Sequence, residues 1–270
     1  MDVFFYIIIF IIGTLFGSFY TLAIYRIPKG QDITHTHSYC PNCEHKLGFW
    51  DLIPVFSYIF LGGKCRYCKE KIRPRYFIIE TISGIFFVLV AYLMGLSLEN
   101  LTNTKIIDYA FIVLYFTFII LMAGIDKENR KINKPVVMYG VIISIIYIVY
   151  LCIIDITSIY RYGIYLVLYI IVLLLDTVTL KKMAINKYVY SIVLSVITMA
   201  IFSGEYATIL SVITTLLAIA IYELFIKLKN SGKSKKTEKN VADKISIGFY
   251  LAIPNIIYFI WILAFYKFLV

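Results

Sequence analysis

Residues 40–68 read CPNCEHKLGFWDLIPVFSYIFLGGKCRYC, and this stretch decides how the rest of the chain is interpreted. It contains two C-x2-C pairs separated by 21 residues. Two such pairs are typical of a tetrahedral zinc site, because each pair forms a tight knuckle that presents two thiolates. We therefore expect a closed, structural zinc site with four protein ligands, Cys40, Cys43, Cys65 and Cys68.

Two disulfides are the alternative for these cysteines. The loop over residues 26–75 carries nine Lys and Arg, which places it on the cytoplasmic side of a membrane. That compartment is reducing, so it favours a metal site over disulfides. His45 lies near the first pair, but four cysteines already complete the ligand set.

The composition indicates a membrane protein. Hydrophobic residues make up 61% of the chain and the mean hydropathy is +0.86, well beyond the range of a soluble globular domain. We expect an all-α polytopic protein with about eight transmembrane helices. The expected spans are residues 2–25, 76–95, 106–124, 136–154, 160–180, 188–202, 207–226 and 246–268, of which the sixth is short for a full crossing.

The predicted domain organisation follows from these spans. Residues 1–25 form a first transmembrane helix, residues 26–75 form a small cytoplasmic tetracysteine loop domain, and residues 76–270 form a transmembrane helical domain. The first segment has Asp2 and no basic residue before its apolar run, so we expect a retained helix rather than a cleaved signal peptide.

The basic residues predict the topology. The chain has a net charge of +10, and 23 of its 26 Lys and Arg lie in the loops 26–75, 125–135, 181–187 and 227–245. The positive-inside rule makes these loops cytoplasmic and places both termini outside. The charge therefore reports topology first and contact with anionic membrane lipid second. No nucleic-acid motif accompanies it, so no nucleic-acid partner is expected.

A short apolar run, LIPVFSYIFL at residues 52–61, lies between the two cysteine pairs. It is too short to span a bilayer. Two positions are open for it: it lies on or dips into the membrane interface, or it packs under the metal cluster.

Two charged residues flank the tetracysteine loop. Arg26 marks the cytoplasmic end of the first span, where an arginine can snorkel to the interface. Glu80 lies about a turn inside the second span, and an ionisable group at that depth is a candidate functional residue. The competing explanation is a structural ion pair with Arg73 or Arg75.

Two aspartates lie near the cytoplasmic ends of apolar helices. Asp126 ends the third span, in LMAGIDKENRKIN, and Asp176 lies in the fifth. A carboxylate at a helix end beside basic residues is often only an interfacial charge. Two intramembrane carboxylates that meet can instead share a proton, one acting as base on a water and the other as acid, as in aspartic proteases.

The motifs together resemble those of the type IV prepilin peptidases. The resemblance is carried by GSFYTLAIYRIP at 17–28, by the cysteine pairs with WDLIPVFSY between them, and by IRPRYFIIE at 72–80. GIDKENRKIN at 124–133 resembles the segment of the first catalytic aspartate and places that residue at Asp126. ISIGFYLAIP near the C-terminus matches weakly.

This resemblance implies a bifunctional aspartyl protease of the inner membrane. Such an enzyme cleaves the basic leader of prepilin or pseudopilin substrates at the cytoplasmic face. It then methylates the new N-terminus with S-adenosylmethionine, and the zinc-binding loop is associated with that second step. Arg26 and Glu80 are then expected in the substrate or methyl-transfer region.

The chain departs from the family pattern in two places. Thr21 stands where the first motif has Asn, and the second catalytic aspartate, expected in a GxGDxK segment, falls on MAINKY with Asn186 at its position. Asn cannot act as a general acid or base. We expect that Asp176 has taken the second role; the alternative is a degenerate, non-proteolytic member that binds pilin-like helices or performs methyl transfer only. A transporter is disfavoured, because the intramembrane charges cluster near one face.

Overall fold

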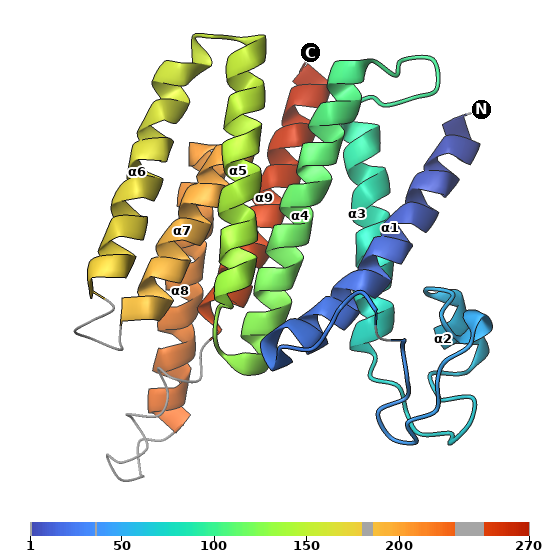
Figure 1. Cartoon of the computed structure of the whole chain (residues 1–270). Coiled ribbons are helices and arrows are strands. Elements are labelled where there is room, and N and C mark those ends of the chain that lie inside the picture. The colour runs from blue at the N-terminus through green and yellow to red at the C-terminus, as the bar shows by residue number, and fades with distance from the viewer. Residues whose placement is uncertain (1, 36, 180–185, 230–245, 270) are drawn as a thin grey trace. The chain divides into compact units, whose positions relative to one another are not determined.

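The computed structural model describes residues 2–35, 37–179, 186–229 and 246–269 (Figure 1). Within these residues the chain is helical, and its β pairing is limited to two isolated bridges. The short elements are η1 (Ile27–Lys29), η2 (Phe49–Asp51) and α2 (Phe56–Phe60). The long helices are α1 (Asp2–Arg26), α3 (Arg75–Leu93), α4 (Asn103–Asn129), α5 (Lys134–Ile154), α6 (Ser158–Thr179), α7 (Asn186–Ser203), α8 (Glu205–Lys229) and α9 (Ile247–Leu269).

The expected all-α membrane architecture is confirmed. Each of the eight predicted spans corresponds to one long helix. Among the described residues, six of these helices are long and apolar enough to cross a membrane, and the apolar parts of α6 and α7 are shorter. α4 extends five residues beyond the predicted span, from residue 124 to Asn129, and these last residues are polar or charged for the most part.

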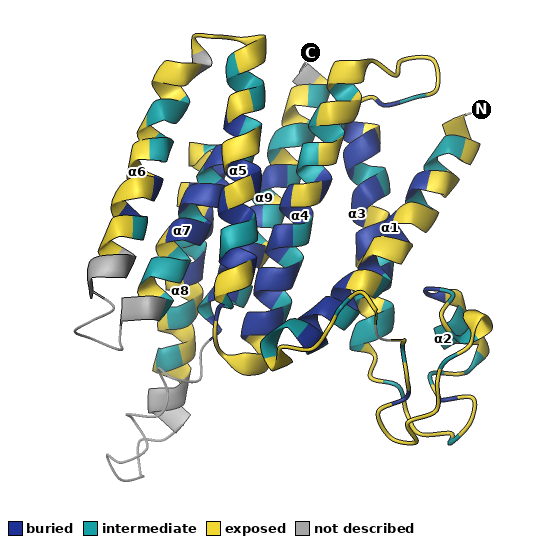
Figure 2. Ribbon diagram, viewed as in Figure 1, coloured by how far each residue is buried: buried dark blue, intermediate teal, exposed yellow. Residues whose placement is uncertain are grey.

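The chain divides into two compact units, Met1–Tyr109 and Ala110–Val270. In the first unit, α1 packs closely against α3. A Cβ atom added at Gly17 would lie 2.6 Å from the Cα of Glu80, and one added at Gly13 would lie 2.8 Å from the Cα of Gly84. Two glycines four residues apart on one helix face allow such an approach in membranes. Much of the rest of α1 is exposed (Figure 2), as suits a helix that faces lipid.

The second unit is a bundle in which α8 packs against α9, and α7 against α5 and α6. Its interior contains a buried polar network around Asn255 of α9. The amide nitrogen of Asn255 donates to Ser203 Oγ at 3.0 Å and to Ser211 Oγ at 3.3 Å, and its oxygen accepts from Tyr115. Hydrogen bonds between helices of this kind stabilise packing inside a bilayer.

Candidate functional site

The four cysteines of the loop converge on one point. Their sulfur atoms all lie within 4.8 Å of one another, and Cys40 Sγ is 3.8 Å from Cys68 Sγ. Zinc–sulfur bonds of about 2.3 Å in a tetrahedron require sulfur–sulfur separations of about 3.8 Å. The cluster can therefore hold a zinc ion with little rearrangement. Because all four positions are protein ligands, such a site is closed to a nucleophilic water.

Each C-x2-C pair is a knuckle with the same local structure. In the first, Cys40 N–H donates to the carbonyl of His45, and the backbone of Glu44 has a φ of 56°. In the second, Cys65 N–H donates to the carbonyl of Glu70, and Lys69 has a φ of 60°. The left-handed residue lets the chain turn back after the second cysteine, which points both sulfurs of each pair toward the centre.

Side chains tie the two knuckles together around the cysteines. The ring of His45 in the first knuckle lies 3.6 Å, between centroids, from the ring of Tyr67 in the second. Asp51, which ends η2, accepts from Arg66 Nε at 2.6 Å and from the Tyr67 hydroxyl at 3.2 Å. His45 therefore has a packing role here, while the four thiols form the ligand cluster.

Two thiols of the cluster have pKa values that differ from that of a free cysteine. Hydrogen bonds from the Glu70 backbone and the Asn42 side chain lower the pKa of the Cys68 thiol to about 6. A hydrogen bond from the His45 backbone opposes the effect at Cys43, yet desolvation and the neighbouring thiols raise its pKa to about 11. The thiols of Cys43 and Cys68 therefore differ in the pH at which they ionise. A divalent ion supplies the charge that lets four thiolates share one site.

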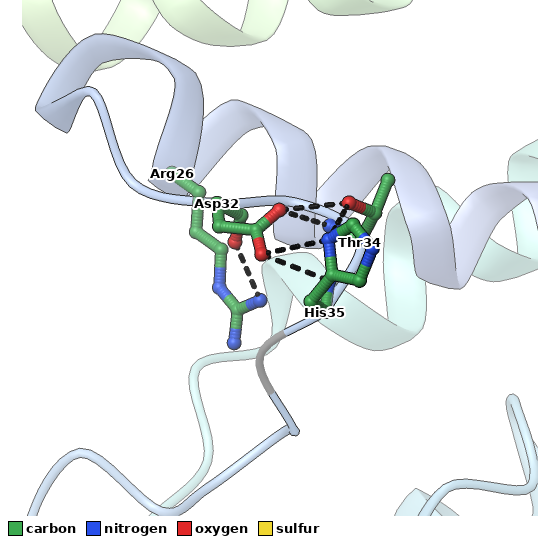
Figure 3. Close-up of polar contacts among 4 residues, drawn as sticks. All are labelled: Arg26, Asp32, Thr34 and His35. Carbon is green, nitrogen blue, oxygen red and sulfur yellow. Dashed lines mark hydrogen bonds and ion pairs between the residues drawn. The ribbon is translucent and has the colours of Figure 1, made fainter.

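Arg26 organises the start of the loop. This buried side chain donates to the carbonyl of Asp32 at 2.9 Å and to that of His37 at 3.1 Å. The Asp32 carboxylate in turn accepts from Thr34 and from the backbone of His35 (Figure 3). Arg26 thus folds the chain back at the end of α1.

Glu80 holds the apolar segment of the loop against α3. Its buried carboxylate accepts from the Val55 N–H at 2.7 Å and also hydrogen-bonds to Ser18. Val55 has a φ of 65° and a ψ of −54°, and Phe56 N–H donates to the Pro54 carbonyl at 2.7 Å. These angles and this bond define a classic γ-turn, which is rare and strained for a β-branched residue. Glu80 therefore stabilises a strained turn.

Asp126 occupies the second site, at the N-terminus of α9. Its side chain is 0% exposed, and Oδ2 accepts from the Phe249 N–H at 3.3 Å while Oδ1 accepts from the Tyr188 hydroxyl at 3.2 Å. Gly248 leaves room for the carboxylate, because a Cβ there would lie 3.2 Å from Oδ2. The partial positive charge of the helix N-terminus attracts an aspartate in this position.

The proposed partner of Asp126 is only partly placed. Asp176 lies in α6, but its side chain is outside the described residues, as is that of Asn186 at the start of α7. Tyr188, two residues after Asn186, does reach Asp126. The start of α7 therefore lies beside Asp126. The pairing of Asp126 with Asp176 stays a prediction.

Sequence reasoning missed two of these partners. Val55 lies in WDLIPVFSY and Tyr188 in MAINKY, but neither segment singles these residues out. Each contacts a carboxylate, 25 and 62 positions away in the chain respectively. A hint was present in each case. An intramembrane carboxylate needs hydrogen-bond donors, and both Glu80 and Asp126 obtain one from a backbone N–H.

One family model matches a segment of the first unit. Residues 11–94 match the family model described as the bacterial peptidase A24 N-terminal domain. That match covers the second part of α1, the tetracysteine loop and α3. No solved structure matches the chain.

Curated relatives agree with this match. The chain is 35% identical over 146 residues to the prepilin leader peptidase/N-methyltransferase of Vibrio cholerae serotype O1, covering 51% of this chain and 56% of the relative. It is 30% identical over 128 residues to the protein of that name from Klebsiella pneumoniae, covering 45% and 52%. The chain thus spans about half the length of these relatives. Its resemblance to the type IV prepilin peptidases is confirmed over that part.

Proposed function

Because this chain is related to the type IV prepilin peptidases over about half of its length, we propose that it processes prepilin-like membrane proteins. It cleaves their basic leader at the cytoplasmic face of the inner membrane. The observation that carries this proposal is the tetracysteine loop, which the structure holds between α1 and α3 within the region that matches the peptidase domain. The distribution of Lys and Arg supports a cytoplasmic loop and extracytoplasmic termini.

We propose Asp126 and Asp176 as the two carboxyl groups of the cleavage step. One carboxylate takes a proton from a water, whose oxygen attacks the scissile carbonyl carbon. The other, protonated, carboxyl group donates its proton to the leaving amine as the peptide bond breaks. Hydrogen bonds from Tyr188 and Phe249 support a fixed orientation for Asp126, which such catalysis requires.

The second candidate is a non-proteolytic protein that binds pilin-like helices or only transfers a methyl group. One observation favours it: Tyr188, near the start of α7, contacts Asp126, and Asn186 stands two residues before it where the family resemblance calls for an aspartate. If no second carboxyl group reaches Asp126, the acid–base cycle lacks one of its two proton carriers.

Methyl transfer needs a place for S-adenosylmethionine. An open groove of about 650 Å³ runs along the first knuckle and is lined in part by Tyr39, Glu44 and Lys46. An aromatic ring, a carboxylate and an ammonium group suit an adenine, a ribose diol and an amino-acid carboxylate, respectively. We propose that these residues hold the cofactor, which supplies the methyl group when bound. Equilibrium binding of S-adenosylmethionine, weakened by Tyr39→Ala with an unchanged metal content, tests this.

Leader loss from a co-expressed prepilin tests the main proposal. We expect the wild type to cleave, Asp126→Asn and Asp176→Asn to abolish cleavage, and the exposed control Asp155→Asn to cleave normally. Cleavage that survives Asp176→Asn would exclude that residue from the mechanism. No cleavage by an inserted wild type, together with a gain in Asn186→Asp, would establish the second candidate.

A further inference from the structure

The tetracysteine loop exposes a group of large apolar side chains. Phe49 and Trp50 of η2 are 76% and 71% exposed, and Phe60 of α2 is 83% exposed. On α2, Phe56, Ile59 and Phe60 are exposed at positions i, i+3 and i+4, so they share one helix face. We call these five residues the apolar face of the loop. Exposure of so many large apolar side chains to water is unfavourable, so this face indicates a partner that covers it.

Two contacts fix the depth of this face relative to a membrane-spanning helix. Val55 N–H bonds to Glu80, and the ring of Tyr58 stacks on that of Phe77 at 5.2 Å. Glu80 is five residues inside α3, which corresponds to about 7.5 Å along the helix axis. α2 is therefore held beside the first turns of a spanning helix. That depth matches the roughly 5–10 Å to which interfacial helices bury their apolar side chains.

The charges of the loop identify the occupant. Residues 26–75 contain nine Lys and Arg against four Asp and Glu, and Lys64, Lys69 and Lys71 of the second knuckle are exposed. Exposed aromatic residues beside basic ones are the pattern of a segment that lies on an anionic bilayer surface. The basic leader expected of a prepilin-like substrate has the same sign of charge as the loop, so it fits this surface less well.

We propose that the apolar face of the loop (Phe49, Trp50, Phe56, Ile59 and Phe60) inserts into the anionic membrane surface and holds the zinc knuckles against it. The aromatic side chains enter the interface beside α3, and the lysines of the second knuckle contact the headgroups. Of the two positions that the sequence left open for residues 52–61, this is the interfacial one. The proposal does not depend on leader cleavage.

Depth-dependent quenching of Trp50 in the full chain tests this insertion. The chain has two tryptophans, so Trp261→Phe leaves Trp50 as a single reporter. The variant is reconstituted in vesicles of phosphatidylcholine with phosphatidylglycerol. We expect strong quenching by lipids with a nitroxide near the headgroup, weak quenching by aqueous acrylamide, and clearly less lipid quenching in pure phosphatidylcholine.

A second substitution checks that the face itself is responsible. Phe60→Asp should lower lipid quenching of Trp50 several-fold and leave the zinc content unchanged. The matched control is Tyr206→Asp, at an 82% exposed residue of α8, which should leave Trp50 quenching as it was.

Four results would overturn the proposal. Free access of acrylamide to Trp50 without lipid quenching would show that the face is in water. Shielding lost on diluting the protein in lipid would assign the face to a second copy of the chain. Shielding that begins only when a prepilin-like segment is added would assign it to the substrate. Equal lipid quenching in neutral vesicles would remove the role of anionic headgroups.

Discussion

Replacing Glu80 by alanine should release the apolar segment of the tetracysteine loop from α3. The Glu80 carboxylate accepts the Val55 N–H at 2.7 Å in a buried position. A buried donor left without a partner costs about 1–3 kcal/mol. The backbone strain of the γ-turn at Val55 costs about 1–3 kcal/mol. Without the Glu80 hydrogen bond this strain is no longer offset, so the turn should open.

The expected size of the effect follows from these terms. Loss of about 1–3 kcal/mol from the closed state raises the open population by about 5- to 150-fold. Glu80→Gln keeps a carbonyl oxygen as acceptor but loses the charge, so it should cost only about 1 kcal/mol, because hydrogen bonds to charged groups are the stronger ones. The ordering of the two variants is as informative as either value.

Hydrogen exchange of the full protein, read by mass spectrometry, measures this opening. The peptide that covers residues 53–60 should exchange faster in Glu80→Ala by about that factor, and less so in Glu80→Gln. The zinc content should stay constant, since none of the ligands is changed. Glu99→Ala, at an exposed glutamate of the same unit, is the control. Unchanged exchange of this peptide in Glu80→Ala would refute the role assigned to Glu80.

Three further predictions concern the same unit. Cys65→Ser should remove the bound metal, because a structural zinc site depends on its full ligand set, whereas Cys152→Ser should keep it; metal analysis decides, and retained zinc in Cys65→Ser would contradict the site. Gly17→Ala should destabilise the α1–α3 pair by about 1–3 kcal/mol through overpacking, measured by thermal unfolding in detergent against Leu15→Ala at an exposed residue. Desolvation raises the pKa of Asp51, but hydrogen bonds from Arg66 and the backbone outweigh it and hold this pKa below its usual value. The ionised Asp51 carboxylate therefore stabilises the fold above pH about 4, and this contribution is lost as the pH falls through the lowered pKa. The urea midpoint of Asp51→Asn should accordingly fall below that of the wild type at pH 7 and converge with it in acid; equal midpoints at pH 7 would exclude this contribution.

The features that sequence predicted well are those with a local signal. Apolar runs of about twenty residues identified the long helices to within a few residues, because the bilayer sets their length. The cysteine spacing predicted the knuckles, since C-x2-C pairs present their sulfurs through local backbone geometry alone. Glycine in a membrane-spanning helix allows close helix packing, and the structure places Gly17 against Glu80.

The features that sequence did not predict depend on residues distant in the chain. Glu80 was considered as a functional group or as a partner of Arg73 or Arg75, yet its carboxylate accepts the N–H of Val55. That bond exists only because the loop folds back onto α3. Similarly, the donors to Asp126 come from α7 and α9, 62 and 123 residues further on. Hydropathy and spacing contain no information on such pairings.

The hydrogen-bond donors around Asp126 give this residue a structural role as well as a proposed catalytic one. A buried carboxylate within a helix bundle is costly, so its presence by itself suggests a use. Here the N-terminus of α9 and the Tyr188 hydroxyl supply compensating donors, and in return the carboxylate satisfies N–H groups that a helix start leaves without partners. Asp126 can therefore be maintained by its structural role alone. Leader cleavage by the proposed mechanism then depends on the second carboxyl group, so Asp176→Asn is a more decisive test than Asp126→Asn. Loss of Asp126 can abolish activity through misfolding of α9. Loss of activity in a folded Asp176→Asn protein requires a chemical role for Asp176.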